Sequence, residues 1–223
     1  MIVIVTGSSS GIGRETVKKF LDNGDIVHGI DISPEYDKEY LNCKVGRYFH
    51  HVADVGKFDQ LPTLYDPSIL INNAGCQNGP DDIRTNLIGV MNCTKKYALL
   101  NKKIKAVVNL ASVSAHNGCE FPEYTASKGG VLSYTVWTAK QIAKYKATCN
   151  SISFGGVETE LNAQVMNDRA KWNDIMSMTP LKKWASAEEA ADWIYFVAKV
   201  NKSMSGQDII IDNLEMLNHR FVW

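Results

Sequence analysis

Short apolar runs alternate with amphipathic stretches along the whole chain. The apolar runs predict strands, and they cover residues 2–6, 26–30, 47–53, 69–72, 105–111, 148–153 and 208–212. Apolar residues spaced by three and four positions predict helices, which cover residues 11–23, 57–65, 83–101, 123–145, 160–176 and 187–199. Strands that are apolar on both faces and separated by helices indicate a parallel sheet covered on both sides. Because no linker or repeat interrupts the alternation, we expect residues 1–223 to form one α/β domain.

A loop of small residues joins the first strand to the first helix. It reads Thr6-Gly7-Ser8-Ser9-Ser10-Gly11-Ile12-Gly13, and Ser10 is a candidate N-cap for the helix. Glycines let the backbone turn sharply and approach a ligand, and the start of a helix offers amides and a positive dipole end to a diphosphate. The pattern therefore predicts a phosphate-binding loop. The alternative is an ordinary turn between strand and helix, although such a turn needs only one glycine.

Asp31 stands at the end of the second strand, 18 residues beyond Gly13. A carboxylate at this place can accept hydrogen bonds from both hydroxyls of an adenosine ribose and would repel a 2′-phosphate. No arginine or lysine lies within residues 8–10 to bind that phosphate. The loop and Asp31 together favour NAD over NADP, unless Asp31 is only a solvated strand end.

Tyr124 and Lys128 lie four residues apart in the predicted helix 123–145, so they project from the same face. A free phenol has a pKa near 10, but a neighbouring cation favours phenolate and lowers that pKa. Such a pair can exchange a proton with an alcohol or a carbonyl oxygen at neutral pH. Alone the pair is a weak signal, because a surface lysine over an aromatic ring has the same spacing.

The composition argues against several other functions. Lys and Arg together number 24, as do Asp and Glu, so no net charge draws the chain toward nucleic acid or an anionic membrane. No apolar stretch approaches the ~20 residues of a membrane span, and the apolar N-terminus lacks the basic flank of a signal peptide. The five cysteines and five histidines show no metal-binding spacing. We therefore expect a cytoplasmic protein with no catalytic metal.

Taken together, motifs spread over essentially the whole chain resemble those of the short-chain dehydrogenase/reductase family. They are Thr6–Gly13, Asp54-Val55, Asn72-Asn73-Ala74-Gly75, Asn86, Ser112, Tyr124 with Lys128, Thr179-Pro180-Leu181 and Ser205-Gly206-Gln207-Asp208. Each motif is weak alone, but the whole set in this order is specific. The resemblance implies a Rossmann-like, doubly wound sheet of seven parallel strands and an NAD(H)-dependent interconversion of an alcohol with a ketone or aldehyde.

The resemblance also implies a role for each matching residue. Tyr124 would be the general acid or base, Lys128 would lower its pKa and bind the ribose, and Ser112 would polarise the substrate oxygen. Asn86 would hold a water in the proton relay from Lys128. The implied cofactor-binding residues are Thr6, Gly7, Ser9, Ser10, Gly11, Ile12, Gly13, Asp31, Ile32, Asp54, Val55, Asn73, Ala74, Gly75, Tyr124, Lys128, Val157 and Thr159.

Three departures from the family pattern concern the substrate side. Phe154 stands where the family usually has proline, which should loosen the following loop unless the ring packs firmly, either in the core or near the nicotinamide. Only ten residues separate Gly75 from Asn86, so the cleft should be more open on that side. The segment before Tyr124 is slightly short, and its residues expected to border the substrate are His116, Asn117, Cys119 and Phe121.

Two further segments carry exposed-looking apolar residues. Methionines and tryptophans within residues 160–185 suit either an adaptable lid or a helix packed on the core. The tail, residues 214–223, ends in apolar residues that usually need a partner surface, so we expect a homodimer or homotetramer. The alternative to an active enzyme is a nucleotide-binding sensor or scaffold on the same fold, impaired in catalysis. No feature of the sequence selects the alcohol or carbonyl substrate.

Overall fold

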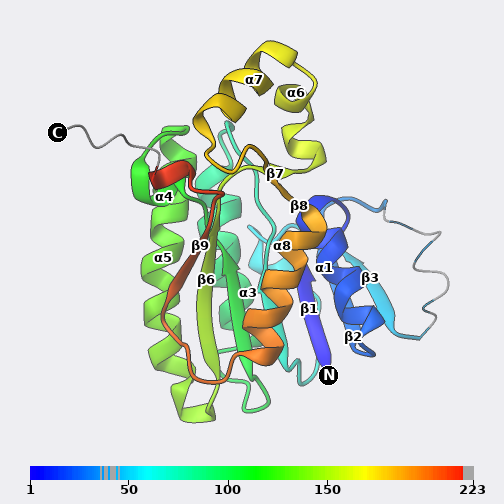
Figure 1. The fold of residues 1–223 in the computed structure, drawn as a ribbon. Helices are drawn as coiled ribbons and strands as arrows, with labels where there is room; N and C mark the ends of the chain where they lie inside the picture. Colours follow the sequence, from blue (N-terminus) through cyan, green and yellow to red (C-terminus); the bar gives the residue numbers. More distant parts are fainter. Residues whose placement is uncertain (36, 38–39, 41–43, 45, 218–223) are drawn as a thin grey trace.

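Seven parallel strands form the central sheet of the structure, a computed structural model that describes residues 1–35, 37, 40, 44 and 46–217. The strands lie in the order β3-β2-β1-β4-β5-β6-β9 (Figure 1). Their bounds are β1 Ile2–Thr6, β2 Ile26–Asp31, β3 Tyr48–Val52, β4 Ile69–Asn72, β5 Ala106–Leu110, β6 Thr148–Phe154 and β9 Asp208–Ile211. Chain order reverses between β1 and β4, which confirms the predicted doubly wound α/β fold.

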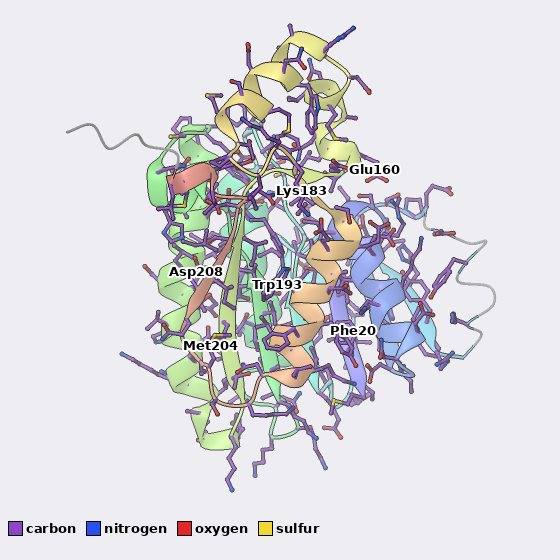
Figure 2. The ribbon with its side chains drawn as sticks, viewed as in Figure 1. Phe20, Glu160, Lys183, Trp193, Met204 and Asp208 are labelled. Carbon is purple, nitrogen blue, oxygen red and sulfur yellow. The ribbon has the colours of Figure 1, made fainter. Side chains whose placement is uncertain are left out.

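Helices cover both faces of the sheet. One face carries α1 (Gly11–Asp22) and α8 (Ala187–Tyr195), and the other carries α3 (Gly89–Tyr97) and α5 (Pro122–Ile142) (Figure 1). Alternation along β1 explains this arrangement, because Val3 and Val5 join the core under α1 and α8, whereas Ile4 joins the core under α3 and α5. Phe20 of α1 packs against Tyr195 of α8 with ring centroids 5.3 Å apart, and Figure 2 shows it between these helices.

Shorter elements connect these layers. They are the 3₁₀ turns Phe58–Gln60, Ala143–Tyr145, Glu160–Asn162 and Glu215–Leu217, the π turns Arg84–Ile88 and Phe196–Val200, the helices α4 Ser114–Asn117, α6 Ala163–Met166 and α7 Arg169–Met178, and the strands β7 Val157–Glu158 and β8 Ala185–Ser186. The strands β7 and β8 pair with each other in a small separate sheet. Neither α4 nor this small sheet was predicted, because such short elements carry no readable period.

Two predicted helices are broken or shortened. The helix expected over 57–65 is a single turn, Phe58–Gln60, because Pro62 follows it closely and cannot donate a helical hydrogen bond. The segment 160–176 is interrupted before α7, where the Asp168 carboxylate caps the new helix. Its Oδ1 accepts hydrogen bonds from the backbone amides of Ala170 and Lys171 at 3.1 and 3.2 Å.

Phe154 packs firmly, so the expected loosening of the loop after β6 does not occur. Its side chain is 5% exposed and belongs to the core under α1 and α8, while it also lines the cavity described below. Its carbonyl accepts a hydrogen bond from the Val113 amide at 3.0 Å, and the Gly155 amide donates to the Ile211 carbonyl at 3.0 Å. Strand pairing thus replaces the stiffness that proline would supply.

The carboxyl ends of the parallel strands share one edge of the sheet, and α6 and α7 stand above this edge (Figure 1). In the described part of the chain, no helix has both the length and the apolar character needed to cross a membrane. Among the same residues, no group of three or more His, Cys, Asp or Glu side chains is arranged to hold a metal ion. Most of the predicted docking tail, residues 218–223, lies outside the described residues.

Candidate active site

A cavity of about 1020 Å³ opens at the carboxyl edge of the sheet. Asp31 lines it at the end of β2, and Tyr124 and Trp184 line it on the side of α5 and β8. Its position where the strand order reverses is the usual ligand site of doubly wound sheets. A single continuous cavity therefore reaches both the predicted phosphate loop and the predicted catalytic residues.

Bare backbone forms the wall of the cavity between β1 and α1. Gly7 has φ +65°, and a Cβ added to Gly13 would lie 1.8 Å from the Gly7 carbonyl oxygen, so only glycine fits there. Ser10 occupies the N-cap position of α1, but its side chain makes no capping hydrogen bond. The start of α1 is consequently not closed by its own N-cap residue, and its positive dipole end faces the cavity.

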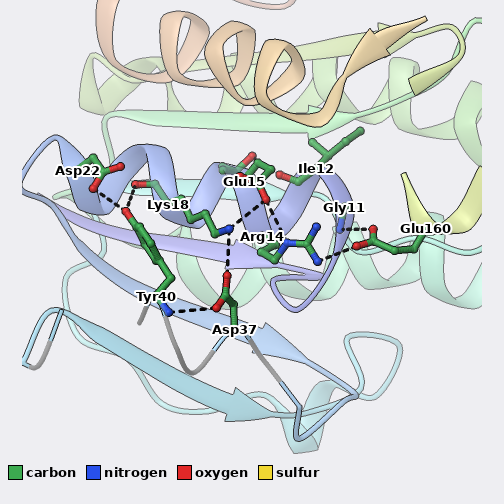
Figure 3. A network of polar contacts seen from close by, with 10 residues as sticks. Gly11, Ile12, Arg14, Glu15, Lys18, Asp22, Asp37, Tyr40 and Glu160 are labelled. Atoms are coloured by element: carbon green, nitrogen blue, oxygen red, sulfur yellow. Dashed lines mark hydrogen bonds and ion pairs between the residues drawn. The ribbon is translucent and has the colours of Figure 1, made fainter. Parts of the chain in front are cut away.

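The Glu160 carboxylate, which also lines the cavity, contacts this helix start (Figure 3). Its Oε2 accepts a hydrogen bond from the Gly11 amide at 3.0 Å, and its Oε1 pairs with Nη1 of Arg14 at 2.7 Å. Burial acts to raise the pKa of Glu160, but these hydrogen bonds and the Arg14 charge outweigh it and hold the pKa below its usual value. An anion of the protein thus lies where a diphosphate is predicted to lie.

Asp31 is held in place by two backbone amides. The Ser9 amide donates to its Oδ2 and the Ser33 amide donates to its Oδ1, both at 2.9 Å. The carboxylate lines the cavity beside Ile32, and each oxygen retains a lone pair for a further donor. The bare backbone of the loop and the Asp31 carboxylate fit the diphosphate and ribose of a dinucleotide, which would have to displace Glu160 from the helix start.

Asp54 and Arg84 form the wall expected to face the adenine ring. Nη1 of Arg84 donates to Asp54 at 2.6 Å, and its Nε donates to Asp81 at 3.0 Å. Burial acts to raise the pKa of Asp54, but Arg84 and the Gly56 amide outweigh it, so the pKa lies below its ordinary value. Arg84 is therefore already paired with two carboxylates.

The predicted catalytic side chains of β5 and α5 meet inside the cavity. The Tyr124 hydroxyl shares a hydrogen bond with the Ser112 side chain, and Ser112 is 5% exposed. The Lys128 ammonium lies 5.5 Å from the centroid of the Tyr124 ring and donates to the Leu110 carbonyl at 2.9 Å. A hydroxyl pair and a buried ammonium beside it form the arrangement needed for proton exchange with a substrate oxygen.

The protonation of this group differs from the expectation. Burial raises the pKa of Tyr124 above its ordinary value, and the Glu120 carboxylate adds to the rise, against a smaller lowering by Ser112. Burial lowers the pKa of Lys128 to about 8. The prediction that Lys128 holds the Tyr124 pKa below normal is therefore wrong in this structure, because desolvation of the phenol dominates. A neutral Tyr124 is suited to donate a proton to a carbonyl oxygen.

Asn86 supports the site without lining the cavity. It lies in the π turn Arg84–Ile88 and is fully buried. Its Oδ1 accepts from the Cys76 amide at 2.9 Å, and its Nδ2 donates to the Cys76 carbonyl at 2.8 Å and to Ser127 Oγ at 3.1 Å. Ser127 in turn donates to the Tyr124 carbonyl at 2.6 Å. Asn86 thus ties the loop after β4 to the helical turn that carries Tyr124.

The cavity brings together most of the predicted site residues. It is lined by Gly7, Ser10, Gly11, Ile12, Asp31, Ile32, Asp54, Val55, Asn73, Ala74, Gly75, Ser112, Tyr124, Lys128, Val157 and Thr159. Four predicted site residues do not line the cavity and support its wall from outside, namely Thr6, Ser9, Gly13 and Asn86. Thr6, for example, uses Oγ1 to accept hydrogen bonds from the Asn73 and Ala74 amides, both at 3.0 Å, and so joins β1 to β4.

The substrate side differs more from the prediction. Four residues were expected to border the substrate but are not part of the cavity wall, namely His116, Asn117, Cys119 and Phe121. Instead His116 binds Asp208 Oδ2 at 2.8 Å and joins α4 to β9. The cavity wall contains Glu120, Glu160 and Glu215, which the sequence patterns did not single out. Only the position of Glu160 directly after Thr159 pointed toward the site.

The short loop between β4 and the π turn is compact. Asp82 is 1% exposed, and its carboxylate accepts hydrogen bonds from the amides of Asn78 and Gly79 at 3.0 and 3.3 Å. Five residues of this loop line the cavity, namely Cys76, Gln77, Gly79, Pro80 and Asp81. The loop therefore still forms a wall of the site despite its length.

Trp184 forms the wall below α7. A Cβ added to Gly156 would lie 1.9 Å from its indole ring, so the loop after β6 and the ring are in direct contact. Trp172 of α7 meets the same ring edge-on, with centroids 5.0 Å apart and an interplanar angle of 83°. Ile175 and Met178 of α7 also line the cavity. The packing interpretation of residues 160–185 therefore agrees with the contact of α7 with Trp184, and an adaptable lid stays a prediction.

Comparisons with known proteins show the family of the chain. The sequence profile described as short chain dehydrogenase matches residues 1–170. The 2-dehydro-3-deoxy-D-gluconate 5-dehydrogenase of Escherichia coli is 27% identical over 95% of this chain and 93% of its own length. The 3-oxoacyl-[acyl-carrier-protein] reductase of Thermotoga maritima is 29% identical over 95% of this chain and 96% of its own length. Both are named for reactions at an alcohol or carbonyl carbon.

Solved structures extend the comparison to three dimensions. The structure of 4-hydroxyisoleucine dehydrogenase complexed with NADH has a TM-score of 0.89 at 26% identity, and the match covers 98% of this chain and 99% of that chain. Levodione reductase, at 24% identity and a TM-score of 0.87 over 98% of both chains, shares the fold. A structure from Agrobacterium tumefaciens with bound NADP also shares the fold, with a TM-score of 0.87 at 23% identity over 97% of this chain and 96% of that chain. The chain belongs to the short-chain dehydrogenase family, as an oxidoreductase that acts on alcohol or carbonyl groups with a nicotinamide cofactor.

Proposed function

We propose that this protein interconverts an alcohol with a ketone or aldehyde, using Tyr124 as the general acid and base. The observation that carries the proposal is the position of Ser112, Tyr124 and Lys128 on the wall of the cavity that also reaches the phosphate loop. A proton donor, a second hydroxyl and a dinucleotide site within one cavity are the parts that such a reaction needs. Residues 1–223 would act as a single dinucleotide-binding domain.

Each catalytic side chain has a distinct task. Bound dinucleotide supplies the hydride chemistry at its nicotinamide ring. In reduction the Tyr124 hydroxyl donates its proton to the substrate oxygen, and in oxidation the Tyr124 phenolate accepts the proton of the alcohol. Ser112 donates a hydrogen bond to the same oxygen as charge develops. Lys128, beside the Tyr124 ring, orients Tyr124 and supplies positive charge to the ribose of the bound dinucleotide. Asn86 keeps the Cys76 loop against α5 and would connect Lys128 to solvent through a water.

NAD is the proposed cofactor in preference to NADP. The support is Asp31, whose carboxylate lines the cavity and would repel a 2′-phosphate. NADH should raise the melting temperature more than NADPH at equal concentration. Asp31→Ala should narrow this difference, whereas Asp59→Asn, which removes an exposed carboxylate outside the cavity, should leave it unchanged. An unchanged preference in Asp31→Ala would rule out this explanation.

The central experiment is a panel of alcohols, ketones and aldehydes, followed by the absorbance of reduced nicotinamide. Turnover of any member that Tyr124→Phe abolishes would support the proposed reaction. Binding of NADH without turnover of any member would contradict it and would instead indicate the nucleotide-binding sensor or scaffold. The same panel would identify the direction and the substrate.

A second copy of the chain is the proposed macromolecular partner. Trp137 on α5 is 45% exposed and stacks on Tyr134 with centroids 5.4 Å apart. On α8, Trp193 points away from the sheet (Figure 2), and its ring lies edge-on to Phe196 at 6.1 Å. Exposed aromatic pairs of this kind mark protein interfaces, and two separate faces suit a homodimer or homotetramer. Free thiols at Cys76, Cys93, Cys119 and Cys149 support a reducing, cytoplasmic location.

A further inference from the structure

The turn after β9 holds an unusual backbone conformation. Asn213 and Leu214 have φ values of +52° and +69°, a region that a bulky residue such as leucine rarely adopts. Asp212 stabilises this turn, because its Oδ1 accepts from the Leu214 amide at 3.0 Å and its Oδ2 from the Met216 amide at 2.8 Å. Strained backbone persists where surrounding contacts hold it, and it is concentrated at functional sites.

The effect of this turn is to carry Glu215 into the wall of the cavity. Glu215 Oε2 accepts a hydrogen bond from the Gly156 amide at 3.2 Å, and Oε1 accepts from the Thr179 hydroxyl at 3.4 Å. A Cβ added to Gly155 would lie 2.4 Å from Glu215 Oε2, so the glycine makes room for the carboxylate. Glu215 thus joins the loop after β6 to the end of α7, on the side of the cavity that holds Phe154 and Trp184.

The Glu215 carboxylate still has hydrogen-bonding capacity. An ionised carboxylate has about four lone-pair positions, and the contacts with the Gly156 amide, the Thr179 hydroxyl and the Trp184 side chain leave one of them for a further donor. Burial raises the pKa of Glu215, which means that its charge is incompletely solvated. A donor on a substrate would therefore gain more from this carboxylate than from one in water.

The charges around the cavity make the Glu215 carboxylate important for the choice of substrate. Among the described residues that line the cavity, the lysines and arginines are Arg84 and Lys128. Arg84 is paired with Asp54 and Asp81, and Lys128 is bonded to the Leu110 carbonyl beside Tyr124. Glu215 and Glu120 add two further carboxylates to the wall. A carboxylate or phosphate on the substrate would meet like charge beside Glu215, whereas Lys128, which is bonded to a neutral carbonyl, places its charge beside Tyr124.

We propose that Glu215 is a specificity-determining residue that selects alcohols or ketones carrying an ammonium or hydroxyl group and disfavours those carrying a carboxylate. The inference rests on the proposed function and names the substrate class of the same site. The ammonium group should be preferred, since it combines donation with opposite charge. Glu215 does not take part in the proton transfer, which Tyr124 performs.

Four compounds that share one secondary alcohol test the proposal. Isopropanolamine, propylene glycol, sec-butanol and β-hydroxybutyrate differ only in the group beside the alcohol, which is ammonium, hydroxyl, methyl or carboxylate. They are assayed as substrates with NAD, and also as competitive inhibitors of the best alcohol found in the panel, so a ranking is obtained even where turnover is slow. The wild-type protein should rank them in the order given.

Substitution at Glu215 should change this ranking in a defined way. Glu215→Gln should lower the preference for isopropanolamine over sec-butanol about tenfold, the usual size of one charge-assisted contact, and should improve β-hydroxybutyrate relative to sec-butanol. Glu215→Asp, which keeps the charge, should retain most of the ammonium preference. Asp59→Asn removes an exposed carboxylate outside the cavity and should leave the ranking unchanged. Melting temperatures of all three variants exclude a folding defect as the cause.

The outcomes separate this inference from the proposed function. Turnover of panel alcohols with the same ranking in wild type and Glu215→Gln would overturn the role of Glu215 and leave the oxidoreductase proposal intact. A wild-type preference for β-hydroxybutyrate over isopropanolamine would also overturn it. No turnover of any alcohol or carbonyl compound would remove the proposed function, and this inference with it.

Discussion

The Glu160 carboxylate and the Gly11 backbone amide are hydrogen-bonded at 3.0 Å, although 149 residues separate them in the chain. Glu160 begins the 3₁₀ turn that leads into α6, whereas Gly11 is the first residue of α1. The contact therefore links the helical segment above the cavity directly to the phosphate loop. A diphosphate entering this loop would compete with Glu160 for the same positive helix end.

Removing the charge of Glu160 should strengthen dinucleotide binding. In Glu160→Gln the competing carboxylate and its repulsion of the diphosphate are lost, so we expect NADH to bind about three- to tenfold more tightly. Fluorescence titration of NADH at low and high salt measures this, and the gain should shrink as salt screens the charge. Glu158→Gln is the control, because the Glu158 side chain is exposed and does not line the cavity. Unchanged or weaker binding in Glu160→Gln would contradict the competition.

Loss of the Tyr124 hydroxyl should stop catalysis without affecting cofactor binding. Tyr124→Phe keeps the ring over Lys128 but removes the proton that the reaction transfers, so turnover should fall by about two to four orders of magnitude. The dissociation constant of NADH should change less than about threefold. Tyr134→Phe on the same helix should retain activity. Wild-type-like turnover in Tyr124→Phe would mean that another group supplies the proton.

Lys128 should make stability depend on pH above neutrality. Its native pKa is about 8, against 10.5 for an ordinary lysine, so between these values the unfolded chain holds a proton that the native protein has released. Native stability from this group therefore rises as the pH increases from 8 to 10.5, and the total change is about 3 kcal/mol.

Chemical unfolding of Lys128→Met at several pH values tests this dependence. The variant lacks the buried charge, so the stability of the wild type relative to Lys128→Met should improve across this alkaline window. Lys140→Met, an exposed position on the same helix, should run parallel to the wild type. A constant difference between wild type and Lys128→Met would mean that the native ammonium is not destabilised by burial.

The exposed aromatic residues should decide the oligomeric state. Trp137→Glu on α5 and Phe196→Glu after α8 each place a charge in a proposed contact between copies, so each should lower the mass in sedimentation experiments. If the two faces form a tetramer, each single variant should leave dimers and the double variant monomers. Lys140→Glu, an exposed charge change beside Trp137, should preserve the wild-type mass. A wild-type monomer would contradict the proposal.

The sheet was predictable because its signals are redundant. The strands β1 and β5 are largely apolar on both faces, and alternate residues such as Ile4 and Val5 enter different cores, so the strand pattern stays visible in a single sequence. The broken segment before α7 was not predictable from apolar spacing, because a cap by Asp168 and local turns decide it. Residues 218–223 lie outside the described residues, so the docking of the tail, residues 214–223, stays a prediction.

The site was predictable where short motifs specify geometry. Gly7, Tyr124 and Lys128 were singled out by their residue type and spacing, and all of them line the cavity. Glu215 arrives from a distant segment through a turn, so nothing near it in the sequence indicates its contact, and Glu160 was indicated only by its place directly after Thr159. The protonation of Tyr124 was wrongly predicted for a related reason. Burial depends on the whole fold, whereas the effect of a neighbouring charge can be read from a four-residue spacing.

The edge-on contact of Trp172 with Trp184 gives the protein an internal optical reporter. One indole belongs to α7 and the other borders the cavity next to Gly156, so any shift of the helix relative to the site changes the surroundings of both emitters. Reduced nicotinamide absorbs light in the range where indoles emit, and its arrival near Trp184 would quench that emission by energy transfer. Occupancy and helix movement could then be recorded in stopped-flow experiments with unlabelled protein, and Trp172→Phe would separate the two signals.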